Sequence, residues 1–158
     1  MTHQLIDQIL QKTSEVKELY YRLVLVVAVP GNGELTELKS IAEQTDMGLV
    51  NVNLELSRRL LTLTARQRSL KVAALLNDIV AAVDSELVLL YHINLLFDPA
   101  LRQDPLRLLQ TLSRRKTIVA VWDGQIQGQH LTYAEPDHPE YRRYPTRELI
   151  LISPPEVS

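Results

Sequence analysis

The residues of this chain that could do chemistry form a glycine-rich turn between an apolar run and a helix-like pattern. Residues 22–36 read RLVLVVAVPGNGELT. A phosphate-binding loop of the Walker A type needs Gly or Ala, four residues, Gly, Lys and then Ser or Thr, between a strand and a helix. Ala28 and Gly33 fit this spacing, but Glu34 stands at the lysine position and Leu35 at the position of the magnesium-binding hydroxyl. The turn therefore predicts a phosphate-binding scaffold without its usual chemistry.

The charge of Glu34 is the main argument against tight nucleotide binding. A unit charge at about 4 Å is worth roughly 4 kcal/mol at an effective dielectric constant near 20, and the change from lysine to glutamate is two units. A micromolar ligand has only about 8 kcal/mol of binding free energy. Two interpretations stay open: a structural loop in which Glu34 satisfies the helix N-terminus, or weak ATP binding through backbone N–H groups. The degenerate nucleotide-binding loop comprises Ala28, Val29, Pro30, Gly31, Asn32, Gly33, Glu34, Leu35 and Thr36, whose hydroxyl comes one residue too late.

A second apolar run, residues 86–93, lacks the acidic residue that phosphate-loop NTPases use to hold magnesium at the end of such a strand. Tyr91 and His92 stand at this Walker B-like position, and Asp84 and Glu86 come before the run. A general-base role for His92 is the alternative to a structural or solvent-facing one. Because the lysine and the metal carboxylate are absent together, we expect no metal, no catalytic residue and no cofactor.

Asp123 directly follows another apolar run, residues 117–122. Such folds place a polar residue that senses the γ-phosphate at this point, so Asp123 is a candidate sensor. The pair Asp123-Gly124 equally predicts a hairpin turn. Short strands are expected to follow it at Gln125–Gln127 and His130–Tyr133.

The elements that must position these residues alternate between strands and helices. Asp104 is expected to cap the helix that begins there, with Pro105 in its first turn. The alternation predicts a three-layer α/β domain of the P-loop NTPase type, with a mainly parallel sheet of about five strands. The expected strands are 23–28, 49–52, 86–93, 117–122 and 148–152, and the expected helices are 3–20, 35–47, 54–63, 66–83 and 104–115. In helix 66–83 the expected buried side is Leu70, Ala73, Ala74, Leu76, Ile79 and Val80, and Ala134–Pro145 is expected to be a loop.

The bulk properties are those of one soluble domain. The 158 residues form a single predicted unit over 1–158, with an N-terminal helix within 1–20 and a hairpin or loop excursion over 123–146. The formal net charge of -2 gives no general attraction to nucleic acid. The absence of cysteine excludes disulfides, zinc thiolates and a cysteine nucleophile. We find no basic leader and no apolar run of membrane-spanning length, so we expect a cytoplasmic protein without membrane contact.

Basic and aromatic residues gather in two segments, the first at residues 114–116 and the second at residues 141–144. In one interpretation the basic clusters contact DNA phosphates; in the other they are solvated helix ends. Tyrosine and arginine are enriched at protein interaction hot spots, so the second segment is also a candidate partner surface. The candidate residues are Arg114, Arg115, Lys116, Tyr141, Arg142, Arg143 and Tyr144.

The chain resembles a known family over nearly its whole length. The most specific stretch is FDPALRQDPLRLLQTLSRRKTIVAVWDGQIQGQHLTYAEPDHPEYRRYP, residues 97–145. It is similar to the small P-loop protein of BREX bacteriophage-exclusion systems, BrxF. The resemblance implies an accessory subunit of a defence system that also encodes a DNA methyltransferase, a large ATPase and a phosphatase-like protein. This chain departs from the family pattern at Glu34, Leu35 and Tyr91, which counts against ATP hydrolysis.

Three functional hypotheses follow. The first is a non-catalytic P-loop-fold subunit that assembles with itself or with other BREX proteins. The second is a nucleotide-binding NTPase or sensor whose site is completed by a neighbouring subunit. The third is a DNA-contacting module of the same system.

Overall fold

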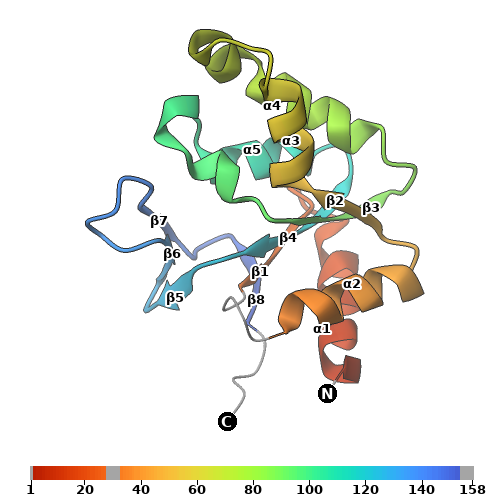
Figure 1. Cartoon of the computed structure of the whole chain (residues 1–158). Coiled ribbons are helices and arrows are strands. Elements are labelled where there is room, and N and C mark those ends of the chain that lie inside the picture. Colours follow the sequence, from red (N-terminus) through yellow and green to blue (C-terminus); the bar gives the residue numbers. More distant parts are fainter. Residues whose placement is uncertain (1, 28–32, 154–158) are drawn as a thin grey trace.

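The structure, a computed structural model, describes residues 2–27 and 33–153 and contains two sheets (Figure 1). The larger sheet has five strands in the order β2-β3-β4-β1-β8, and every neighbouring pair is parallel. The α/β class and the five-stranded parallel sheet predicted from the sequence are therefore confirmed. Its strands are β1 (Leu23–Val27), β2 (Gly48–Asn51), β3 (Leu87–Tyr91), β4 (Thr117–Trp122) and β8 (Ile150–Ile152).

Helices cover both faces of this sheet, which gives three layers (Figure 1). One face packs against α1 (Thr2–Val16) and α2 (Glu34–Gln44), and the other against α3 (Val52–Leu60), α4 (Ala65–Ala81) and α5 (Pro105–Leu112). Two short 3₁₀ turns, η1 (Asn94–Phe97) and η2 (Pro99–Leu101), lead from β3 towards α5. Asp104 caps α5, as expected: its carboxylate accepts a hydrogen bond from the Arg107 backbone N–H.

Strand β1 lies between β4 and the edge strand β8 and is buried on both faces, which explains its valine-rich composition. Its residues alternate between the two layers: Val24 and Val26 pack with α1 and α2, whereas Leu23, Leu25 and Val27 pack with the opposite layer. The register runs from Leu23 opposite Ile118 to Val27 opposite Trp122. The C-terminal ends of β1 and β4 therefore lie side by side.

The excursion between β4 and β8 is an antiparallel sheet of β5 (Gln125–Gln127), β6 (His130–Tyr133) and β7 (Arg142–Pro145). The prediction of a hairpin turn at Asp123-Gly124 is wrong, because β4 and β5 do not pair; the hairpin joins β5 to β6 at Gly128, whose φ is 61°. The prediction of a loop over Ala134–Pro145 is wrong at its end, where β7 pairs with β6.

An aromatic cluster attaches the small sheet to the core. The Phe97 ring stacks on the Tyr133 ring with a centroid distance of 3.6 Å, and both rings pack against Trp122. The Trp122 indole N–H donates to the Thr132 carbonyl oxygen at 3.0 Å. Gly124 permits this close approach, since a Cβ there would lie 2.0 Å from the same carbonyl oxygen.

Two further expectations need correction. Helix α1 ends at Val16 rather than near residue 20, because the chain turns there to enter β1. On α4 the buried residues are Val72, Leu76, Ile79 and Val80, whereas Leu70, Ala73 and Ala74 are exposed. Helix α4 thus carries apolar residues on two faces and buries only one of them.

Candidate functional site at the carboxyl edge of the sheet

The carboxyl ends of β1, β3 and β4 form one edge of the sheet, where the chain changes faces. From β1 the chain leads into α2 on one face, whereas from β4 it leads into the small sheet on the other face (Figure 1). In open α/β sheets such a switch point is the usual place for a ligand. The predicted loop residues Ala28–Asn32 follow β1 and lie outside the described residues.

The start of α2 agrees with the expected strand–glycine–helix order. Gly33 is its N-cap residue, with φ 82° and no side-chain hydrogen bond to the first turn, and the helix begins at Glu34. Leu35 packs against the cluster between α1, α2 and the sheet. The position of a magnesium-binding hydroxyl is thus occupied by a partly buried apolar residue. Thr36 is exposed.

The end of β3 carries an aromatic residue in place of a carboxylate. Tyr91 is half-buried, and the Lys39 ammonium of α2 lies 4.5 Å from its ring centroid. This cation–π contact connects α2 to the end of β3. His92 follows with its ring centroid 5.0 Å from that of Tyr91.

His92 adopts a left-handed backbone conformation, with φ 50°. Its carbonyl oxygen accepts a hydrogen bond from the Asn53 backbone N–H at 2.8 Å, and the Asn53 side chain accepts one from the Leu95 backbone N–H. Such backbone is uncommon for a residue other than glycine and persists where its surroundings hold it. The imidazole itself is exposed. Asn53 therefore fixes the turn that carries His92.

Asp123, at the end of β4, lies beside residues that follow β3. Burial raises the pKa of the Asp123 carboxyl above its ordinary value; a hydrogen bond from Asn94 and the nearby His92 oppose this increase. The Asn94 amide also donates to the Tyr133 hydroxyl at 2.9 Å. Burial likewise raises the pKa of Tyr133, against the effect of the Asn94 hydrogen bond. At this edge the Asp123 carboxyl group is therefore part of a network of polar side chains.

The sequence interpretation identified Asp123, Tyr91 and His92 at this edge and missed four neighbours. Lys39, Asn53, Asn94 and Tyr133 come from α2, α3, η1 and β6. For Asn53 and Asn94 the sequence did offer one indication of a place at this edge, because each follows shortly after an expected strand. Lys39 and Tyr133 had no such indication. In the described part of the chain, no group of three or more His, Asp or Glu side chains is arranged to hold a metal ion.

The basic and aromatic candidates contact groups of their own chain at two different places. The Arg114 guanidinium lies 4.5 Å from the Tyr20 ring centroid, and the Lys116 ammonium donates to the Val83 carbonyl oxygen, both near the amino end of β4. Arg142 on β7 donates to the Gln103 carbonyl oxygen at 2.7 Å. Two further candidates on β7 also have partners: Tyr144 donates to the Asp104 carboxylate, and Arg143 lies 3.2 Å from a ring nitrogen of His130.

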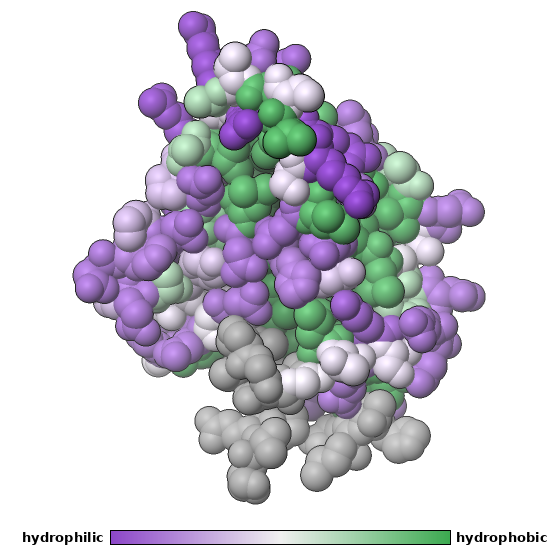
Figure 2. All heavy atoms as spheres, viewed as in Figure 1, coloured by the Kyte–Doolittle hydropathy of each residue, from purple (hydrophilic) through white to green (hydrophobic). Residues whose placement is uncertain are grey.

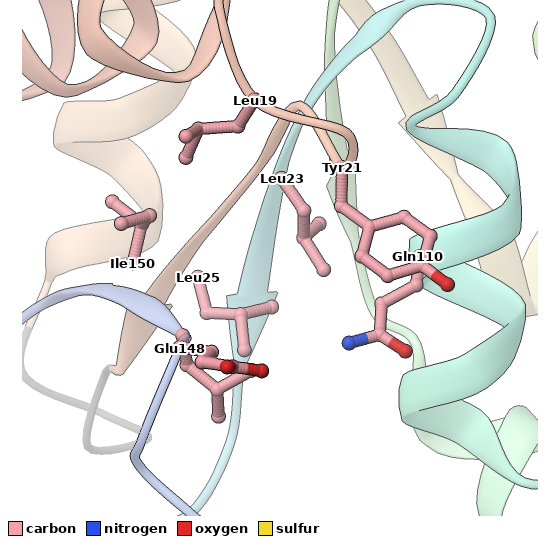
Figure 3. Close-up of a pocket in the computed structure, with 8 residues that line it drawn as sticks. Leu19, Tyr21, Leu23, Leu25, Gln110, Glu148 and Ile150 are labelled. Carbon is pink, nitrogen blue, oxygen red and sulfur yellow. The ribbon is translucent and has the colours of Figure 1, made fainter.

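A separate hollow lies between α5 and the starts of β1 and β8 (Figure 3). It is lined by Leu19, Leu23, Leu25, Glu148 and others, and holds about 30 Å³, room for roughly one water molecule. Tyr21 and Gln110 at one wall also line a more open hollow of about 250 Å³. Neither hollow includes a residue of the carboxyl edge.

Comparison with known proteins gives no assignment: no family model matches the chain, and no curated protein matches it. Within the part of the chain that the structure describes, no helix combines the length and the hydrophobicity that crossing a bilayer requires.

Proposed function

We propose that this chain is a non-catalytic subunit with a P-loop-type scaffold, which acts by assembling with itself or with other proteins of a BREX defence system. The observation that best supports this proposal is the set of residues at the carboxyl edge of the sheet. There a glycine N-cap precedes a helix that begins with Glu34, and β3 ends in Tyr91 and His92. The position of β1 inside the sheet beside β4, at the switch point, supports the P-loop interpretation.

The chemistry of this edge explains the expected lack of turnover. Phosphoryl transfer needs cations that neutralise charge developing on the phosphate oxygens, and a carboxylate that holds magnesium. Glu34 begins α2 with the opposite charge, and Leu35 is a partly buried apolar residue that cannot coordinate magnesium. The Lys39 ammonium contacts Tyr91, more than one helical turn beyond the lysine position of the motif.

Titration of the full chain with Mg·ATP in a calorimeter tests the non-catalytic part of the proposal. We expect no binding in the micromolar range and no phosphate release. The double variant Glu34→Lys, Leu35→Thr restores the motif and should gain affinity. Glu43→Lys, at the exposed far end of α2, makes the same charge change as Glu34→Lys and should gain none. Micromolar binding or turnover by the unmodified chain contradicts the proposal.

The defence context rests on the resemblance and has its own test. Co-expression of the tagged chain with the large ATPase, the methyltransferase and the phosphatase-like protein of a BREX system should yield a complex that survives purification. A chain that co-purifies with none of them argues against this assignment.

A second function, a nucleotide sensor completed by a neighbouring subunit, is favoured by one observation. Asp123, Asn94 and His92 converge from two strand ends at the carboxyl edge. A polar residue there can respond to a γ-phosphate whose charge another subunit neutralises. This function predicts nucleotide affinity that appears only on assembly and falls in Asp123→Ala. Failure to bind nucleotide in every assembly state would exclude it.

A further inference from the structure

Helix α4 has an exposed apolar face in addition to its buried one. Leu70 is 72% exposed, and Ala73, Ala74 and Ala81 are exposed as well. At 100° per residue these four side chains share one side of the helix with Arg66 and Asn77. Figure 1 shows α4 at the outside of its layer, and Figure 2 shows apolar atoms at the surface among hydrophilic ones in this region.

The charges along α4 oppose the dipole of the helix. Arg66 and Arg68 lie near its N-terminus and Asp78 near its C-terminus, the reverse of the favourable arrangement. Arg68 has a local role, because its side chain donates to the carbonyl oxygens of Leu60 and Leu63. Lys71 and Asp78 are exposed and take part in none of the three ion pairs that the described residues form.

The charges on α4 are complementary to those on a second copy of the helix that runs antiparallel to the first. Lys71 and Asp78 lie about two turns apart on the same flank of the apolar face, at equal distances from a point between residues 74 and 75. A twofold axis at that point would set Lys71 of each copy opposite Asp78 of the other. It would also set Ala74 near the axis and direct Leu70 into the space between Ala74, Asn77 and Ala81 of the second copy.

We propose that α4 is the interface of a symmetric homodimer, in which two copies of this helix pack antiparallel. The inference rests on the assembly role proposed above and names a second copy of the chain as the partner. The residues at its centre are small, so the helices can approach closely, and the two Lys71–Asp78 pairs set the register. One helix pair buries less area than a standard protein interface, so a dimer of micromolar affinity is expected.

Sedimentation equilibrium of the full chain over a range of concentrations tests the dimer. Wild type should dimerise, and Ala74→Glu, which brings two carboxylates together at the axis, should be monomeric with an unchanged far-ultraviolet spectrum. Lys71→Glu and Asp78→Lys should each raise the dissociation constant roughly tenfold, and the double exchange should restore it. Lys17→Glu makes the same charge change at an exposed site outside α4 and should have no effect.

Cross-linking tests the register separately. The chain has no cysteine, so a single introduced thiol is the only one that can oxidise. Ala74→Cys should form a disulfide between copies, because only residues near the twofold axis come within bonding range. Ser40→Cys, exposed on α2, should not.

The inference is overturned if the chain is monomeric throughout, if Ala74→Glu still dimerises, or if the double exchange fails to restore association. These outcomes leave the Mg·ATP titration untouched. If the chain is monomeric and does not bind Mg·ATP, the α4 interface is wrong and the non-catalytic scaffold stands. If the chain dimerises through α4 and hydrolyses ATP, the α4 interface stands and the non-catalytic scaffold is wrong.

Discussion

At the residue scale, Asp123 is the ionisable group whose environment matters most at the carboxyl edge. Because burial raises its pKa, the folded state holds this proton more tightly than the unfolded state does. The resulting stability is complete below the unfolded pKa and is lost as the pH rises through the folded pKa. Above the raised pKa the ionised carboxyl therefore disfavours folding.

The variant Asp123→Asn removes this charge and keeps an oxygen that accepts from Asn94. We expect its free energy of unfolding at pH 7 to exceed that of wild type by about 0.5 kcal/mol, a small value because solvent screens a half-buried group. The gain should disappear as the pH falls below the raised pKa. Urea unfolding at several pH values measures it; a variant less stable than wild type at neutral pH would show that the carboxylate is held by contacts that require its charge.

Gly124 and Gly128 need glycine for different reasons, and alanine separates them. At Gly124 a Cβ would lie 2.0 Å from the Thr132 carbonyl oxygen and 2.7 Å from the Trp122 indole nitrogen. At Gly128 a Cβ meets nothing within 4 Å, but φ is 61°. We expect Gly124→Ala to cost about 3 kcal/mol by overpacking and Gly128→Ala about 1 kcal/mol by backbone strain.

The fluorescence of Trp122, the only tryptophan, reports both unfolding transitions. Equal losses in the two variants would mean that the small sheet moves away from Trp122 to accommodate the methyl group.

The structural role of a residue could be predicted from the sequence when its contacts are with residues nearby in the chain. Gly33 and Glu34 were placed correctly because a glycine turn and a helix start are local features. The contact between Asn94 and Tyr133 spans 39 residues and was invisible in the sequence. Gly124 was interpreted as part of a hairpin turn for the same reason. Glycine is required there because a side chain would collide with the Thr132 carbonyl oxygen on β6.

At the element scale, α5 and β7 are joined through one carboxylate. Asp104 caps α5 and accepts from the Tyr144 hydroxyl at 2.7 Å. Asp104→Ala loses both interactions and should cost about 1–2 kcal/mol, whereas Tyr144→Phe loses only the second and should cost about 1 kcal/mol. Asp104→Asn keeps an acceptor for both and should remain close to wild type.

Urea unfolding of the three variants ranks these contributions. A loss in Tyr144→Phe as large as that in Asp104→Ala would mean that the cap contributes nothing and that the link to β7 carries the whole effect.

Elements were predicted well where burial alone determined them. The apolar runs of β1, β3 and β4 are covered on both faces, so composition identified them. Strand β7 was missed because it is four residues long, contains Arg142 and Arg143 and depends on pairing with β6. On α4 the predicted burial of Leu76, Ile79 and Val80 is confirmed. The predicted burial of Leu70, Ala73 and Ala74 is wrong, because these residues are as apolar as a core face and periodicity does not say which of two apolar faces is buried.

At the scale of the whole molecule, the arrangement of charge decides whether DNA is a partner. Affinity for a duplex grows with the number of phosphates that cations neutralise together. Here the net charge is -2, and the two basic segments lie in different parts of the fold. Arg114, Lys116 and Arg142 already contact groups of their own chain.

We therefore expect no binding of a labelled duplex by micromolar protein at about 0.15 M salt, measured by fluorescence anisotropy, and at most weak binding at low salt. Salt-sensitive binding that weakens in the double variant Arg114→Ala, Arg115→Ala, but not in the control Lys17→Ala, would contradict this expectation. That pattern would locate a phosphate-contacting surface at the amino end of β4, opposite the carboxyl edge. The DNA hypothesis would then gain a defined site, and Tyr144 and the two arginines of β7 would stay a candidate surface for protein partners alone.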